Sequence, residues 1–185
     1  MGRLIVSTHM TLDGAIDSTE RWFIPHQESE QHGFNQLRAA AALVLGRKTY
    51  EGLAGVWPDM TDDTGFAEQV NSIPKFVASR TLQAPLEWNA TLLEGDLAER
   101  LSALKRESDG NLLMYGCGEL AHELIQHGLV DELQFWVNPV VLGGDDGDGD
   151  SGERPFHGRG PVALELVSST AFGSGVVLLS YRPVG

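Results

Sequence analysis

A short apolar run at 41–45 (AALVL) stops abruptly at Gly46, and it constrains the fold more than any other stretch. An apolar run of this length next to a Gly is typical of a strand buried on both faces, as in a parallel sheet. The polar residues 47–49 (RKT) follow at once, and 50–53 is predicted to be the first turn of a helix. Cations and a hydroxyl beside a helix start form a geometry that binds anions. An ordinary strand-to-helix turn with solvated cations fits this stretch equally well.

Apolar runs and helical patterns alternate along the rest of the chain. Strands are predicted at 3–8, 41–45, 75–78, 91–93, 111–115, 131–137, 162–167 and 176–181. Helices are predicted at 28–40, 66–71, 97–106 and 119–126, besides the turn at 50–53. The last two runs, joined by a turn-rich link at 168–175, are typical of an antiparallel hairpin. The pattern predicts an α/β fold with a central mixed, mostly parallel sheet and an antiparallel edge.

The composition limits the classes of function. A chain of 185 residues with 42% hydrophobic residues is most simply one globular domain over 1–185. A net charge of -13 argues against general nucleic-acid or anionic-membrane binding, so an anionic ligand requires a local basic pocket. The single Cys117 excludes an internal disulfide and fits a reducing compartment. With no apolar run near 18 residues and no basic-then-apolar leader, we expect a soluble cytoplasmic protein.

Three of the predicted strands end in polar or Gly-rich turns: GRKT at 46–49, SRT at 79–81 and GCGEL at 116–120. In open parallel sheets ligands collect at the carboxyl ends of strands, so three such turns can line one crevice. The glycines at 116–118 suit close approach of a pyrophosphate. A guanidinium such as that of Arg80 suits the 2′-phosphate that distinguishes NADPH from NADH, because it pairs with phosphate in a bidentate fashion.

The segments LGRKTYEG, VASRTL, MYGCGEL and LVDELQFWVNPVVLGG, with the opening STHMTLDG, resemble the dihydrofolate-reductase-like superfamily. The closest branch is the one related to the reductase domain of bacterial riboflavin biosynthesis, and the resemblance covers nearly the whole chain. It implies a three-layer fold with helices on both faces of the sheet, NADPH as hydride donor, and frequent homodimers. Matched motif to motif, it implies that these residues contact the dinucleotide: Gly46, Arg47, Lys48, Thr49, Ser79, Arg80, Thr81, Gly116, Cys117, Gly118, Glu119 and Leu120.

Two carboxylates are candidates for catalysis. Glu30 lies 16 residues before Gly46 and four before Phe34, the offsets of the carboxylate that assists hydride transfer in dihydrofolate reductases. A buried carboxylate with a raised pKa could protonate the acceptor. The alternative is an exposed acid in the first turn of a helix. The same resemblance implies that Asp13 lies on the loop beside nicotinamide and substrate, where it can orient substrate groups. The alternative is that it simply forms an Asp-Gly turn.

Two tryptophans, the single cysteine and the histidines are further candidates for ligand contacts. Trp22 and Trp57 are candidates to stack on a flat substrate, although core or loop packing is the simpler account of each. Cys117 is expected to be a small residue between glycines rather than an activated thiolate. The six histidines lack ligand spacing, so no metal site is predicted. The sequence departs from the branch after VVLGG, where an acidic loop at 145–150 reads as a solvated loop rather than a calcium site.

These observations predict an NADPH-dependent reductase of a small heterocyclic or carbonyl substrate, acting as a homodimer without nucleic-acid or membrane partners. The alternative from another class is a non-catalytic nucleotide-binding module. Two further alternatives are 5-amino-6-(5-phosphoribosylamino)uracil reductase and dihydrofolate reductase. The first usually carries a fused deaminase domain, and no H-x-E with P-C-x-x-C is present here. The second is disfavoured by the first loop, TLDGAI, which lacks that enzyme's Trp.

Overall fold

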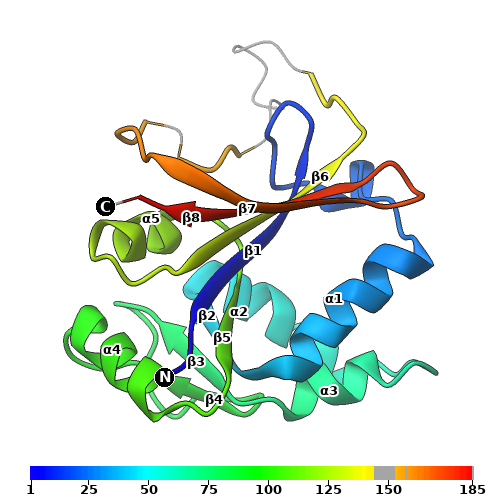
Figure 1. The fold of residues 1–185 in the computed structure, drawn as a ribbon. Coiled ribbons are helices and arrows are strands. Elements are labelled where there is room, and N and C mark those ends of the chain that lie inside the picture. The colour runs from blue at the N-terminus through cyan, green and yellow to red at the C-terminus, as the bar shows by residue number, and fades with distance from the viewer. Residues whose placement is uncertain (144–152, 157, 185) are drawn as a thin grey trace. The chain divides into compact units, whose positions relative to one another are not determined.

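The computed structural model describes residues 1–143, 153–156 and 158–184 (Figure 1). The strands are β1 (Leu4–Thr11), β2 (Ala40–Gly46), β3 (Lys75–Ala78), β4 (Ala90–Leu92), β5 (Asn111–Tyr115), β6 (Glu132–Asn138), β7 (Leu164–Ala171) and β8 (Val177–Pro183). The α-helices are α1 (Gln27–Ala39), α2 (Arg47–Ala54), α3 (Phe66–Ser72), α4 (Leu97–Glu107) and α5 (Glu119–Gln126), with short 3₁₀ turns at Thr19–Arg21 and Trp57–Asp59. The strands are hydrogen-bonded in the order β4-β3-β2-β5-β1-β6-β8-β7.

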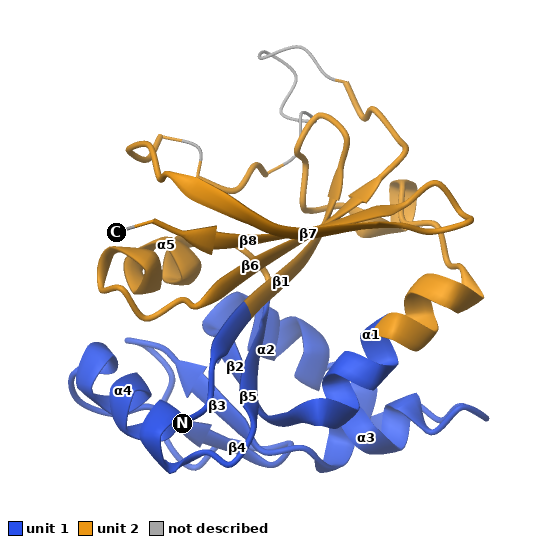
Figure 2. Ribbon diagram, viewed as in Figure 1, with its two compact units in different colours: residues 1–5, 33–115 blue, residues 6–32, 116–185 orange. Residues whose placement is uncertain are grey.

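The chain forms two compact units, coloured separately in Figure 2. Unit 1 consists of residues 1–5 and 33–115, and unit 2 consists of residues 6–32 and 116–185. Neither unit is a continuous stretch of sequence. The prediction of one domain over 1–185 stays a prediction.

Unit 1 contains the parallel strands β4, β3, β2 and β5. Strand β2 pairs in parallel with β3 on one side and with β5 on the other, and β3 pairs in parallel with β4. Both faces of β2 are buried, since Leu43, Val44 and Leu45 are each 0% exposed. This confirms the interpretation of the 41–45 run as a strand covered on both faces.

Unit 2 contains the antiparallel strands β6, β8 and β7. The predicted C-terminal hairpin is confirmed, but its turn is shorter than predicted. Strand β7 continues to Ala171, which pairs with Val177 of β8. The polar sequence at 168–171 suggested a turn, whereas these residues form an exposed edge strand that needs no apolar face. Together with unit 1, this confirms the α/β class with a mixed sheet and an antiparallel C-terminal edge.

Helix boundaries agree closely with the sequence patterns, with one informative difference. The α5 and β5 boundaries are as predicted, and Asp96 caps α4 by accepting a hydrogen bond from the Glu99 amide at 2.9 Å. Helix α2, however, begins at Arg47 rather than at Tyr50. The RKT residues therefore belong to the first helical turn and do not form a loop before it.

Lys75, the first residue of β3, is buried at 1% exposure. Its Nζ donates hydrogen bonds to the carbonyls of Asn71 (3.0 Å) and Ile73 (2.8 Å) at the end of α3. It also lies 4.2 Å from the centroid of the Trp88 ring. Helix C-terminal carbonyls and an aromatic face both favour a cation. Burial nevertheless lowers the pKa of the Lys75 ammonium to about 8.

Among the described residues, no helix combines the length and the apolar character that a membrane crossing requires.

The lowered pKa of Lys75 predicts a pH-dependent contribution to stability. Between about pH 8 and pH 10.5 the unfolded chain holds more protons at this lysine than the folded protein, so folding becomes more favourable as pH rises. The difference in unfolding free energy between wild type and Lys75→Met should therefore change in favour of wild type by on the order of 3 kcal/mol across this range. Denaturant unfolding at several pH values measures it. The exposed Lys48→Met is the control, and a pH-independent difference for Lys75→Met would contradict the prediction.

Candidate functional site

The carboxyl ends of three parallel strands lie at one edge of the sheet in unit 1. Gly46, the last residue of β2, is directly opposite Ala78, the last residue of β3. On the other side of β2, Val44 is opposite Met114, next to the end of β5. The turns at 46–49 and 79–81 therefore begin side by side, which is the arrangement that the sequence predicted for them.

The first of these turns leads directly into α2. Gly46 has an extended backbone (φ −77°, ψ 163°), and no side chain caps the helix. The first turn carries no acidic residue, so its charged side chains are the cations Arg47 and Lys48. Arg47 forms an ion pair with Glu51 at 3.6 Å, in which both side chains are about half exposed (48% and 47%). Such an exposed pair contributes little stability, so an incoming anion can replace the Glu51 carboxylate.

The second turn is fixed by the hydroxyl of Ser79. Its Oγ accepts hydrogen bonds from the amides of Thr81 (3.2 Å) and Leu82 (3.0 Å). Arg80 and Thr81, which follow it, are exposed. Ser79 therefore shapes the turn, while the next two residues carry the cation and the second hydroxyl at its surface.

The third predicted turn follows β5 along the chain and belongs to unit 2. Gly116 has φ +88°, which favours glycine. Cys117 is 0% exposed, and burial raises the pKa of its thiol to about 12. Its neutral side chain points into the protein, so this residue can meet a ligand only through its backbone. Leu120 is half-buried. The dinucleotide contacts predicted for residues 116–120 stay predictions.

Asp13 is the centre of a hydrogen-bond network within unit 2. Its carboxylate accepts from the Thr11 hydroxyl (2.6 Å) and from the amides of Leu142 (3.1 Å) and Gly143 (3.0 Å). Arg154 pairs with the same carboxylate at 3.7 Å. The Thr11 hydrogen bond, assisted by the two amides, lowers the pKa of Asp13 to about 2. Asp13 is therefore ionised near neutral pH and ties the 11–17 loop to the segments on either side of 144–152.

The second candidate acid, Glu30, lies in the first turn of α1 and is exposed. Of the two alternatives for this residue, the structure fits the exposed acid in the first turn of a helix rather than the buried carboxylate. Its neighbours make the contacts of this turn: the Glu28 carboxylate accepts from the Gly173 amide at 3.0 Å, and Ser29 is buried. An α-helix places successive residues 100° apart, and the exact rotation of this first turn is set by its tertiary contacts.

The two tryptophans differ in exposure. Trp22 is 3% exposed, and its indole N–H donates to the Asp17 carbonyl at 2.7 Å. A buried ring offers no face to a substrate, so Trp22 packs within unit 2 instead. Trp57, in unit 1, is half-buried against Phe66, with ring centroids 5.3 Å apart.

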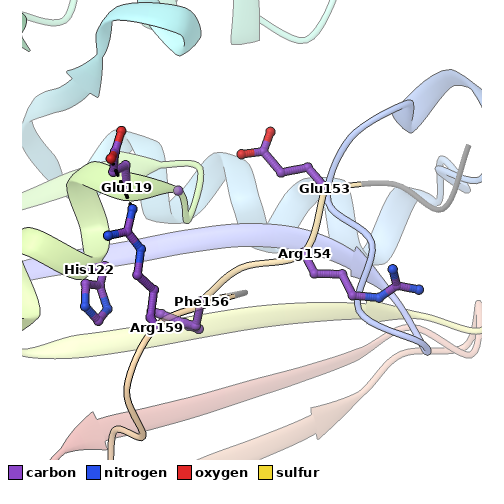
Figure 3. A pocket seen from close by; sticks show the side chains of 7 residues that line it. Glu119, His122, Glu153, Arg154, Phe156 and Arg159 are labelled. Atoms are coloured by element: carbon purple, nitrogen blue, oxygen red, sulfur yellow. Dashed lines mark hydrogen bonds and ion pairs between the residues drawn. The ribbon is translucent and has the colours of Figure 1, made fainter. Parts of the chain in front are cut away.

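Unit 2 also contains a pocket of about 250 Å³ that the sequence patterns did not reveal. Its lining residues are Gly118, Glu119, His122, Glu153, Arg154, Phe156 and Arg159. In Figure 3, Arg159 extends to Glu119, with His122 beside it. Arg154 and Arg159 are the only Lys or Arg residues between Arg106 and Arg182, and this isolation was the signal available in the sequence. The acidic run at 145–150 lies outside the described residues.

Comparisons with known proteins show the family and the fold of this chain. The family described as "RibD C-terminal domain" matches residues 3–178. The chain is 29% identical over 189 residues to the uncharacterized protein YyaP of Bacillus subtilis, covering 97% of this chain and 94% of that protein. It is similar in structure to a putative riboflavin biosynthesis protein from Shewanella sp. PV-4 (TM-score 0.72, 20% identity, 100% of both chains). It is also similar to dihydrofolate reductase from Enterococcus faecalis complexed with NADP(H) (TM-score 0.58, 17% identity, 100% of this chain and 98% of that chain).

The lowered pKa of Asp13 predicts an acid-resistant loop. Because the folded pKa is about 2 and the ordinary value is 3.8, the hydrogen bonds to Leu142 and Gly143 should persist from neutral pH to about pH 4 and weaken as pH falls through 2. The amide NMR signals of these two residues should titrate with a midpoint near pH 2. Asp13→Asn should abolish this titration. A midpoint near the ordinary aspartate value would contradict the assignment.

The burial of Cys117 predicts that native protein is inert to thiol reagents. A neutral thiol at 0% exposure lacks both the thiolate and the access that the reaction needs. At pH 8 the folded protein should show negligible labelling by a disulfide reagent, and denaturant should release one equivalent per chain. Rapid stoichiometric labelling of folded protein would show that the 116–118 turn opens readily.

Proposed function

Because the chain belongs to the RibD C-terminal domain family, we propose that it is an NADPH-dependent reductase of a small heterocyclic or carbonyl compound. The family and the dihydrofolate reductase neighbour support a reductase-type function. The observation that carries the choice of cofactor is the Gly46–Ala78 register, which sets two cation-bearing turns next to each other. NADPH and the substrate class are our proposals.

The residues of unit 1 fit the phosphate end of NADPH. Arg47 and Lys48 lie in the first turn of α2, where backbone amides are available. Arg80 lies in the adjacent turn and supplies a planar guanidinium, which matches the 2′-phosphate. Thr49 and Thr81 add hydroxyl donors. This cation cluster contrasts with a net charge of -13 for the whole chain, so it provides the local basic surface that an anionic ligand requires.

When bound, NADPH supplies the hydride, and the chain supplies binding and orientation. Arg47, Lys48 and Arg80 would fix the phosphates and thereby the position of the dinucleotide. Asp13 would act as a positioning residue, because its ionised carboxylate already accepts three hydrogen bonds and keeps the 11–17 loop in one conformation. It is a poor proton donor, since its pKa is about 2. Glu30 stays the predicted proton source, although its side chain is exposed to solvent rather than buried.

The substrate contact proposed in unit 1 is Trp57. Its ring is partly exposed and is supported from one side by Phe66. Its backbone carbonyl accepts a hydrogen bond from the Asn71 side chain at 2.9 Å, which fixes the turn that carries it. A supported and partly exposed indole suits a flat heterocycle.

We also propose that the protein is a homodimer that uses the edge strand β7. Seven of the eight β7 residues are exposed. Among them, Leu166 and Val167 are 54% and 53% exposed, although they are large and apolar. An edge strand with exposed apolar side chains is a suitable surface for a second copy of the chain.

A nucleotide-binding module without turnover is the second candidate. The observation that favours it is the state of the two candidate acids, since Glu30 is exposed and Asp13 is ionised. The two candidates differ in one measurable property. Both bind NADPH, but only the reductase oxidises it steadily when a substrate is supplied.

The cofactor proposal predicts a selective effect of Arg80→Ala. Loss of a guanidinium–phosphate pair should weaken NADPH binding by about tenfold or more, whereas NADH, which lacks the 2′-phosphate, should be affected little. Titration with each dinucleotide, followed by tryptophan quenching, measures both constants. Arg100→Ala removes an exposed cation on α4 of the same unit and is the matched control.

Equal losses for both dinucleotides would mean that Arg80 does not recognise the 2′-phosphate. Failure of the wild-type protein to bind either dinucleotide would overturn the proposed function itself.

A further inference from the structure

Two adjoining hollows in unit 2 share a wall formed by Phe156 and Arg159. The first, of about 250 Å³, is mainly polar, with side chains from Glu119, His122, Glu153 and Arg154. The second, of about 310 Å³, is mainly apolar, with side chains from Leu133, Pro161, Val162 and Leu164. A polar and an apolar compartment that meet at one wall suit a ligand with the same two parts.

The shared wall is carried by a constrained turn. The backbone of Phe156 has φ +63°, a left-handed conformation that is unfavourable for a bulky side chain. The Arg159 amide donates a hydrogen bond to the Phe156 carbonyl at 2.9 Å and closes the turn. The turn thus brings an aromatic ring and a guanidinium to the boundary between the hollows.

Arg159 has an exchangeable partner. Its Nη2 lies 3.1 Å from Glu119 Oε1 (Figure 3), with side-chain exposures of 39% for Arg159 and 85% for Glu119. An ion pair with so exposed a carboxylate contributes little stability. A phosphate or carboxylate of a ligand can therefore replace Glu119 as the partner of the Arg159 guanidinium. In bidentate geometry the ligand would accept two hydrogen bonds from it instead of one.

Of the two arginines that line the polar hollow, Arg159 has the partner that is more readily exchanged. Arg154 is already paired with Asp13 at 3.7 Å. The Nδ1 atom of His122 is buried and has no hydrogen-bond partner among the described residues. Its ring is 6.3 Å from that of Phe156, at the shared wall. A buried polar atom without a partner is unfavourable, and a ligand atom in the hollow would relieve this cost.

We propose that the two hollows form one binding site for an amphipathic anion. The anionic group of the ligand replaces the Glu119 carboxylate as the partner of the Arg159 guanidinium. The flat apolar part of the ligand lies against Phe156 in the second hollow. This inference rests on the proposed function in one respect, namely the identity of the molecule that carries the anionic group. The anion belongs either to the dinucleotide or to a substrate that carries a phosphate or carboxylate.

The test is an NMR titration of the full chain with phenyl phosphate, observed at the amides of Glu119 and Arg159. The Arg159→Gln variant separates this site from the cation-bearing turns of unit 1, because those turns are unchanged in it. Arg159→Gln should weaken binding by about tenfold or more. Glu119→Gln should strengthen it by about threefold, because the competing carboxylate is gone. Arg182→Gln, which breaks the exposed Arg182–Glu165 pair, should have no effect.

Inorganic phosphate should bind at the same amides about tenfold more weakly than phenyl phosphate, because it leaves the apolar hollow empty. The proposal is overturned if phenyl phosphate shifts neither amide, or if Arg159→Gln binds it as tightly as Arg182→Gln does. If both Arg159→Gln and Glu119→Gln bind phenyl phosphate more weakly than wild type, the proposal is also overturned. That result would mean that the Arg159–Glu119 ion pair maintains the structure of the site and is not replaced by the ligand.

A parallel titration with NADPH identifies the source of the anion. If Arg159→Gln weakens NADPH and phenyl phosphate equally, the site holds the phosphates of the dinucleotide. If NADPH affinity is unchanged, the site holds a separate anionic substrate. Loss of the proposed function would appear differently, as wild-type protein that binds phenyl phosphate at these amides but binds no dinucleotide.

Discussion

The parallel pairing of β2 with β3 and β5 is the constraint on which the proposed cofactor site depends. Val77 of β3 is fully buried, whereas Phe76 and Ala78 on either side of it are only partly buried, so a shift of one residue would turn Val77 toward the less buried face. The same register sets Gly46 opposite Ala78, so burial in the core also determines where the two turns begin. A cation at position 47 or 80 alone would not indicate a binding site. The register brings together the starts of the two turns that carry these cations.

The backbone of this fold was largely predictable from the sequence, because its strands are short apolar runs that end at Gly or at polar residues. Where prediction failed, a local pattern was decided by distant contacts. The spacing of Glu30 fitted both a buried carboxylate and an exposed acid. The structure shows that it is exposed, beside a Glu28 that accepts a hydrogen bond from the distant Gly173 amide. Residues 168–171 looked like a turn, because an exposed edge strand has no apolar face to reveal it. The Glu119–Arg159 pair spans 40 positions, so no local pattern could predict it.

Charge is arranged locally in this acidic chain. Arg47, Arg154 and Arg159 are each paired with a carboxylate at 3.1–3.7 Å. The pair of Arg154 with Asp13 is embedded in further hydrogen bonds from Thr11, Leu142 and Gly143, and it maintains a loop. The pairs of Arg47 and Arg159 are more exposed and suit exchange with a ligand anion. The same type of ion pair thus has a structural role at one position and a binding role at the other two.

The most direct test of the central claim is to map bound NADPH on the protein by amide NMR, with NADH as the comparison. The account predicts that NADPH shifts the amides of residues 46–49 and 79–81 together, because the Gly46–Ala78 register makes them one surface. With NADH the shifts at 79–81 should be much smaller, since the 2′-phosphate is absent. If NADPH binds and shifts neither turn, the dinucleotide lies elsewhere, and the parallel edge of unit 1 is an ordinary set of strand-to-helix turns.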